Sequence, residues 1–150
     1  MERRPFRSMR RSAFDLSTME KNMFAPIKTP EDIALFLDKT NSLHDGYVLD
    51  VRYTHNGITK LEHGHYFEQE KTKLTVRILV TSIWNTVVEI EFEDIWDWQY
   101  KHRQLDITDT SVWFDEQKRI VWTDSNCADT VKTKEGSYVI ASSMKWRIVK

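Results

Sequence analysis

The chain has 150 residues, of which 40% are hydrophobic and 30% charged, and its formal net charge is −1. A chain of this size and composition fits one domain, whose core is large enough to fold without disulfides or metals. Its one cysteine, Cys127, excludes an internal disulfide and a cysteine-rich zinc site. No apolar run approaches the roughly 18 residues that a membrane span requires, so we expect a cytoplasmic protein without a membrane segment.

The charge is unevenly distributed along the chain. Residues 1–28 hold seven Lys/Arg against three Asp/Glu, whereas residues 29–150 hold fifteen against twenty. We therefore expect a basic N-terminal arm, 1–28, and a mildly acidic single β-rich domain with a leading helix, 29–150. Nucleic acid binding needs a positive surface, which only the arm offers, through Arg3, Arg4, Arg7, Arg10 and Arg11. The arm either binds nucleic acid or anionic lipid or is a flexible tail, and the sequence favours the tail.

The clearest helix signal begins at Thr29, a good N-cap residue that Pro30 follows at the first helical position. Two acidic residues in the first turn suit the positive end of the helix dipole. The apolar spacing gives a stripe that must pack against another element, namely Ile33, Phe36 and Leu37. We expect the helix to end near Asn41-Ser42.

After this helix the apolar period changes to two, which is typical of half-buried strands. In the first strand we expect one face to carry Tyr47, Leu49, Val51 and Tyr53. Asn56-Gly57 predicts a tight hairpin turn, with a return strand over 58–67. The other strands are expected over 74–80, 86–93, 111–114, 120–124 and 138–148. Together they predict a mainly β (α+β) fold, in which an antiparallel meander forms a curved sheet, sandwich or partly closed barrel with one N-terminal helix packed against it.

An acidic and aromatic segment follows the cleanest alternating strand, and we interpret it as a surface for a basic protein partner. Trp96 and Trp98 lie where the alternation becomes irregular, so we expect them on the surface. The predicted partner-binding residues are Glu89, Glu91, Glu93, Asp94, Trp96, Asp97 and Trp98.

A second candidate site is a pocket at the junction between the helix and the first strand. His44 and Asp45 either bond to the end of the helix or act as an acid–base pair, and the adjacent positions favour the structural role. Trp122 and Asp124 place an aromatic ring beside a carboxylate, although alternation also favours Trp122 in the core.

Other candidates for chemistry are weaker. His63-Gly64-His65 would put two imidazoles on one strand face, but no third ligand follows at a characteristic spacing, so we predict neither a metal nor a cofactor. Phosphate loops, metalloprotease motifs and serine elbows are absent from the sequence, and Cys127 has acidic neighbours that disfavour its thiolate.

Three stretches carry a resemblance to a known group of proteins: Leu43-His44-Asp45, residues 120–125 and Lys145-Trp146-Arg147. They resemble small uncharacterised bacterial β-rich proteins, some of which are similar to immunity proteins of toxin systems. The resemblance covers residues 43–147 and implies a protein that works by binding, without catalytic residues to carry over. We therefore expect a non-enzymatic interaction module. The alternative is a small-molecule-binding protein or enzyme with a pocket lined by Trp, Tyr and His.

Overall fold

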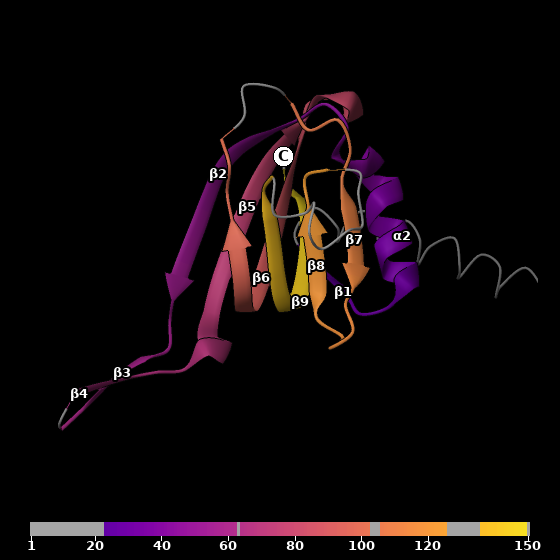
Figure 1. Cartoon of the computed structure of the whole chain (residues 1–150). Coiled ribbons are helices and arrows are strands. Elements are labelled where there is room, and N and C mark those ends of the chain that lie inside the picture. Colours follow the sequence, from indigo (N-terminus) through magenta and orange to yellow (C-terminus); the bar gives the residue numbers. More distant parts are fainter. Residues whose placement is uncertain (1–22, 63, 103–105, 126–135, 150) are drawn as a thin grey trace, which may run out of the picture.

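The computed structural model describes residues 23–62, 64–102, 106–125 and 136–149. These residues form a curved antiparallel sheet of seven strands, one α-helix against it, and a hairpin that extends beyond the sheet (Figure 1). The sheet strands are β1 (Ala25–Ile27), β2 (Gly46–His55), β5 (Thr72–Val80), β6 (Thr86–Gln99), β7 (Ser111–Phe114), β8 (Ile120–Thr123) and β9 (Tyr138–Val149). The hairpin strands are β3 (Ile58–Leu61) and β4 (Gly64–Phe67).

The predicted fold class is confirmed: the chain is mainly β, with an open curved sheet and a single described α-helix. The strand order is β2-β5-β6-β9-β8-β7, and β1 pairs with β9. The order therefore departs from a strict meander, because the last strand lies between β6 and β8. In addition, β1 falls within the predicted basic arm, so the sheet begins earlier in the chain than residue 29.

The core follows from strict alternation in the central strands. In β5 every second residue from Thr72 to Val80 is buried. Residues opposite one another in β5, β6 and β9 then bury the same face, as Val76, Ile90 and Trp146 do. Across this face, the Phe36 ring lies edge-on to Trp146, with ring centroids 5.4 Å apart.

The helix α2 (Pro30–Lys39) begins as predicted and ends slightly earlier than expected. The Thr29 hydroxyl accepts a hydrogen bond from the Asp32 N–H, and the Asp32 carboxylate accepts one from the Thr29 N–H, which completes a capping box. Phe36 is buried, while Ile33 and Leu37 pack partly buried against the core. The predicted apolar stripe is thus the face with which the helix contacts the sheet.

The Asn56-Gly57 prediction is wrong, because these residues do not reverse the chain. Neither has a positive φ, which a type I′ turn would need at both positions. Instead, the Asn56 N–H bonds to the Lys71 carbonyl and the Glu68 N–H to the Gly57 carbonyl. The strands β2 and β3 therefore continue one another, as do β4 and β5, and they form one long hairpin whose outer part projects from the sheet (Figure 1). A side chain at Gly57 would collide with the Glu68 carbonyl, with its Cβ 2.4 Å from that oxygen. Close backbone approach thus requires this glycine.

The prediction that four residues of β2, from Tyr47 to Tyr53, share one face is only partly right. The pairing between β2 and β5 shifts by one residue between Val48 and Asp50, so Leu49 lies in a β-bulge. Before the bulge Val48 packs against the core, and after it Val51 does. Tyr47 and Leu49 are consequently both 48% exposed.

The strands expected over 111–114 and 120–124 are confirmed, and they form a hairpin. Strands β7 and β8 pair across a turn at 115–119, closed by bonds between the Asp115 and Arg119 backbones and by the Asp115 carboxylate. No helix in the described part of the chain is long and apolar enough to cross a membrane.

Candidate functional site

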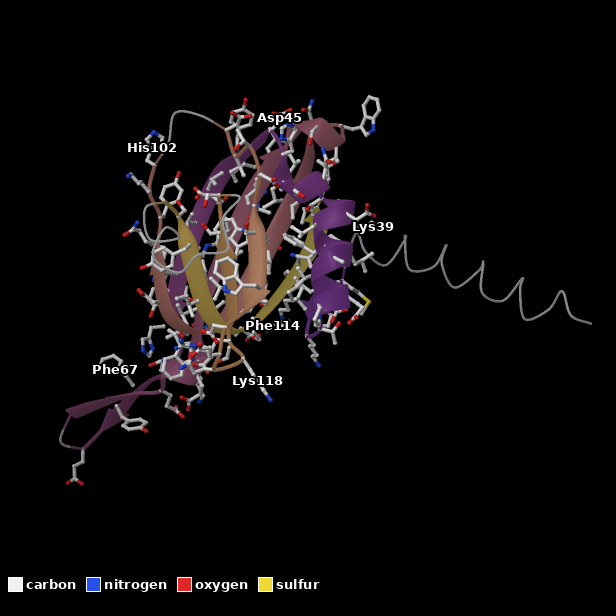
Figure 2. The ribbon with its side chains drawn as sticks, turned by 45° about the vertical axis from the view of Figure 1, so that its right-hand side comes forward. Lys39, Asp45, Phe67, His102, Phe114 and Lys118 are labelled. Atoms are coloured by element: carbon white, nitrogen blue, oxygen red, sulfur yellow. The ribbon has the colours of Figure 1, made fainter. Side chains whose placement is uncertain are left out.

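Two connecting segments meet at one end of the sheet, where β2 begins and β5 ends. The Asn41 amide donates to the Ser82 hydroxyl, which in turn donates to the His44 carbonyl. Thr81 donates to the Asp45 carbonyl through both its N–H and its hydroxyl. We call this surface, made of residues 41–45, 81–85 and 106–109, the turn end. Figure 2 shows Asp45 at this end and Phe67 on the hairpin at the opposite end.

The backbone of the turn end is strained. Eight described non-glycine residues have a positive φ, and six of them lie here: Asn41, Ser42, Leu43, Asp45, Trp84 and Asn85. A left-handed backbone costs an L-residue about 1–2 kcal/mol, and least for Asn and Asp. Trp84, at φ 63° and ψ 42°, is the least expected of the six, because its side chain gains nothing locally from this conformation. Such strain is concentrated at functional sites more often than elsewhere.

Trp84 is also the most exposed large apolar side chain among the described residues, at 94%. Other tryptophans of the chain stabilise the fold: Trp122 and Trp146 are buried, and Trp98 stacks on Tyr53. Trp84 makes no hydrogen bond or ring contact within the described residues. Its indole therefore stands free in solvent, as an anchor residue of a protein interface does before binding.

Carboxylates surround His44 at the turn end. The imidazole Nδ1 lies 2.6 Å from the Thr108 carbonyl oxygen, and Nε2 lies 3.6 Å from the Asp45 carboxylate. The hydrogen bond to Thr108 raises the pKa of His44 above its usual 6.5, and the negative charges of Asp45, Asp106 and Asp109 raise it further. No lysine or arginine among the described residues pairs with these three aspartates. The turn end is therefore an acidic surface with one titratable imidazole inside it.

The predicted acidic strip lies elsewhere, and its glutamates are paired. Glu89, Glu91 and Glu93 share the outer face of β6, opposite the core. Arg147 lies 2.7 Å from Glu89, and Lys145 lies 3.1 Å from Glu91 and 3.8 Å from Glu93. These cross-strand pairs reduce the charge that the strip can offer to a partner. That the strip binds a protein stays a prediction.

The remaining strip residues follow an irregularity in β6. The sheet bends where Asp94 adopts φ 58° and the pairing shifts between Ile95 and Asp97. Trp96 is 53% exposed, as predicted, and lies under the Arg119 guanidinium, whereas Trp98 turns toward Tyr53. Asp94 accepts a hydrogen bond from Ser142 and Asp97 one from Tyr138. Burial raises the pKa of Tyr138, and the Asp97 carboxylate adds to this effect.

The four predicted pocket residues are split between two places. His44 and Asp45 lie exposed at the turn end, where the His44 imidazole contacts the Thr108 carbonyl, and their structural role stays a prediction. Trp122 and Asp124 are buried, at 2% and 4% exposure. The Asp124 carboxylate accepts a hydrogen bond from the Ser137 N–H. It also lines a hollow of about 230 Å³ with Gly46, Tyr47, Val48, Tyr100, Lys101, His102 and Ile107.

A smaller space shares two lining residues, Val48 and Tyr100, with this hollow. Its volume is about 10 Å³, and its lining includes Trp122, whose buried Nε1 has no hydrogen-bond partner. Of the four predicted residues, Trp122 and Asp124 therefore lie beside a real depression. Neither of these two spaces includes His44 in its lining.

Several predictions fall outside the described residues: the five arginines of the basic arm, Cys127, and the side chains of His63 and His65. Within the described ranges no group of three His, Cys, Asp or Glu side chains is placed to hold a metal.

The sequence reasoning missed Trp84, Asp106 and Asp109. The strands predicted over 74–80 and 86–93 leave Trp84 in the connection between them, and a tryptophan in a short turn was the available signal. The two aspartates have no local signal, because only the fold brings them near His44. Comparison of the chain with family models, curated proteins and solved structures found no match.

Proposed function

We propose that this chain is a cytoplasmic, non-enzymatic interaction module that binds a basic partner protein through the turn end. The observation that carries the proposal is Trp84, a 94% exposed indole held in a strained backbone at the turn end, whose three aspartates have no lysine or arginine partner among the described residues. Burying a tryptophan in a partner's apolar pocket is the contact most often found at binding hot spots. The aspartates would add attraction to a positive rim and speed association.

The resemblance to immunity proteins of toxin systems points to the same class of function, a bacterial protein that works by binding. An interaction of this kind needs a shaped, charged surface and no reactive group. The acidic partner surface expected from the sequence therefore has better support at the turn end than at the Glu89–Asp97 strip, whose glutamates have lysine and arginine partners.

The proposal is tested by site-specific photo-crosslinking in cells of the source organism. A photo-reactive phenylalanine replaces Trp84 in one variant and Trp96, the other exposed tryptophan outside the hairpin, in the matched control. We expect one basic protein to be captured at position 84 and not at 96. Neutralising the acidic surface with Asp45→Asn, Asp106→Asn and Asp109→Asn should abolish this product. Equal capture at both positions, or a captured protein without basic character, would contradict the proposal.

A second candidate function is small-molecule binding in the hollow beside Asp124. It is favoured by two tyrosine rings in the wall, Tyr47 and Tyr100, and by the Trp122 indole in the adjoining small space, whose Nε1 has no hydrogen-bond partner among the described residues. A thermal-shift screen with small polar aromatic compounds tests it, since a ligand that binds only the folded chain raises its melting temperature. Stabilisation that Tyr100→Ala removes and Trp84→Ala leaves intact would assign the ligand to the hollow.

A further inference from the structure

One edge of the sheet is left without a neighbouring strand by the described residues. Strand β2 pairs with β5 on one side, and on its other side the described residues supply only a single bridge, between Gly46 and Ile107. The opposite edge strand, β7, contacts α2. Figure 1 shows β2 at the open side of the sheet. An exposed strand edge is a template for pairing with another chain unless the protein blocks it.

Two rows of alternating charge cross the outer face of the sheet and end at this edge. In register, the first row contains Asp50, Arg77, Glu89 and Arg147. The second row contains Arg52, Thr75, Glu91 and Lys145. Within the rows Arg77 lies 3.0 Å from Asp50, Arg147 2.7 Å from Glu89, and Lys145 3.1 Å from Glu91. The rows thus begin at the edge with opposite charges.

The two edge charges are incompletely satisfied. Arg52 has no ion pair within the described residues. Arg77 engages only Oδ2 of Asp50, and the other carboxylate oxygen, Oδ1, is buried without a hydrogen-bond partner among the described residues. Between these two residues lies Val51. The sequence on the two sides of Val51 is complementary. The residues next to it are an acid and a base, and the residues two positions away, Leu49 and Tyr53, are both apolar or aromatic.

We propose that β2 is the interface of a two-fold symmetric dimer, in which β2 of a second copy of this chain pairs antiparallel with it and Val51 lies on the axis. In this register Asp50 faces Arg52 of the second copy, and Arg52 faces the second copy's Asp50. At the junction each charge row then meets a charge of opposite sign from the other sheet. Opposite charges directly across antiparallel strands stabilise the pairing, and like charges destabilise it.

The same register covers exposed apolar surface. Leu49 faces Tyr53 of the second copy on both sides of the axis, and these side chains are 48% and 41% exposed in the single chain. The bulge at Leu49 limits regular pairing to the residues near Val51, so the dimer is small and depends on concentration. A two-fold interface uses the β2 edge of both copies, and the assembly therefore closes at two chains. The inference does not depend on the partner proposed for the turn end.

Analytical ultracentrifugation of the full chain over a concentration series tests the proposal. We expect a reversible monomer–dimer equilibrium. Arg52→Asp places two carboxylates opposite each other at both ends of the pairing, and Asp50→Arg places two cations there. Each variant alone should dimerise at least about tenfold more weakly. Lys118→Asp, the same charge change in the β7–β8 turn, should leave the equilibrium unchanged and serves as the matched control.

The decisive measurement is the equimolar mixture of the two single variants. One chain then carries only cations at these positions and the other only carboxylates, so we expect the mixture to form a dimer as tight as the original. Circular dichroism of each variant checks folding, and recovery in the mixture also shows that both variants are folded. A wild-type chain that stays monomeric, dimerisation that tolerates Arg52→Asp, or a mixture that fails to associate would each overturn the proposal. A chain that stays monomeric yet binds extended peptides along β2 would assign the edge to another occupant.

Discussion

At the scale of single residues, Trp84 combines a strained backbone with an exposed side chain. Its left-handed backbone is strained, and its side chain makes no compensating contact within the described residues. Glycine adopts this conformation without penalty. We therefore expect the free energy of unfolding of Trp84→Gly to exceed that of Trp84→Ala by about 1 kcal/mol, since alanine keeps the strain. Urea denaturation of both variants measures the difference, and equal stability would show that the position is not strained. Both variants should lose the proposed partner, because both lack the indole.

His44 gives the turn end a dependence on pH. Its folded pKa is raised above 6.5, first by the hydrogen bond to the Thr108 carbonyl and then by Asp45, Asp106 and Asp109. A raised folded pKa means that protonation stabilises the fold at low pH, and that this contribution is lost as the pH rises through the folded pKa. An NMR titration should place the His44 midpoint above 6.5, and Asp45→Asn should lower it. A wild-type midpoint at or below 6.5 contradicts the assigned environment. Binding of a basic partner should strengthen over the same rise in pH, because deprotonation removes a positive charge.

At the scale of elements, the sequence predicted those helices and strands whose defining residues lie close together in the chain. The capping box and the apolar stripe of α2 lie within a few residues of one another, so the sequence around Thr29 defines the helix. The alternation in β5, β6 and β9 likewise gave the buried face. The turn predicted at Asn56-Gly57 does not form, because backbone hydrogen bonds to Lys71 and Glu68 hold these two residues in an extended conformation. The bulge at Leu49 has no local signal, since it arises from the register of β2 against β5.

The cap of α2 provides a stability prediction. Thr29→Ala removes the acceptor for the Asp32 N–H and should destabilise the chain by about 1 kcal/mol, whereas Thr29→Ser keeps the bond and should cost much less.

The pKa of Asp32 is lowered, chiefly by the Lys28 N–H and also by Thr29. A lowered folded pKa contributes stability above the unfolded value of 3.8, and this stability is lost as the pH falls through the folded pKa. Denaturation of Asp32→Asn should therefore show a shallower loss of stability in acid than the wild type. An equal loss in both would contradict this role.

At the scale of the whole molecule, the sequence predicted the class of the fold and not its strand order. The position of β9 between β6 and β8 depends on pairing between segments that are distant in the chain, which no local pattern specifies. The candidate site has the same origin, because the turn end joins residues 41–45, 81–85 and 106–109. Of these residues, the sequence predicted only His44 and Asp45 as parts of a site.

The projecting hairpin should be separable from the rest of the fold. Its described aromatic side chains, Tyr66 and Phe67, are 56% and 58% exposed, and its two strands pair only with each other. The hydrogen bond between the Glu68 N–H and the Gly57 carbonyl already closes the hairpin at its base. Replacing residues 58–67 with a two-residue turn should therefore change the free energy of unfolding by less than about 1 kcal/mol, because it removes no described core contact.

Urea denaturation followed by tryptophan fluorescence measures the effect of this deletion, and Phe36→Ala provides the contrast. That substitution removes a fully buried ring from the contact between α2 and Trp146, and it should cost about 3–5 kcal/mol. A deletion as costly as Phe36→Ala would mean that the hairpin belongs to the cooperative fold. If the deletion preserves stability and also leaves crosslinking at position 84 unchanged, the turn end binds its partner without help from the hairpin at the opposite end of the sheet.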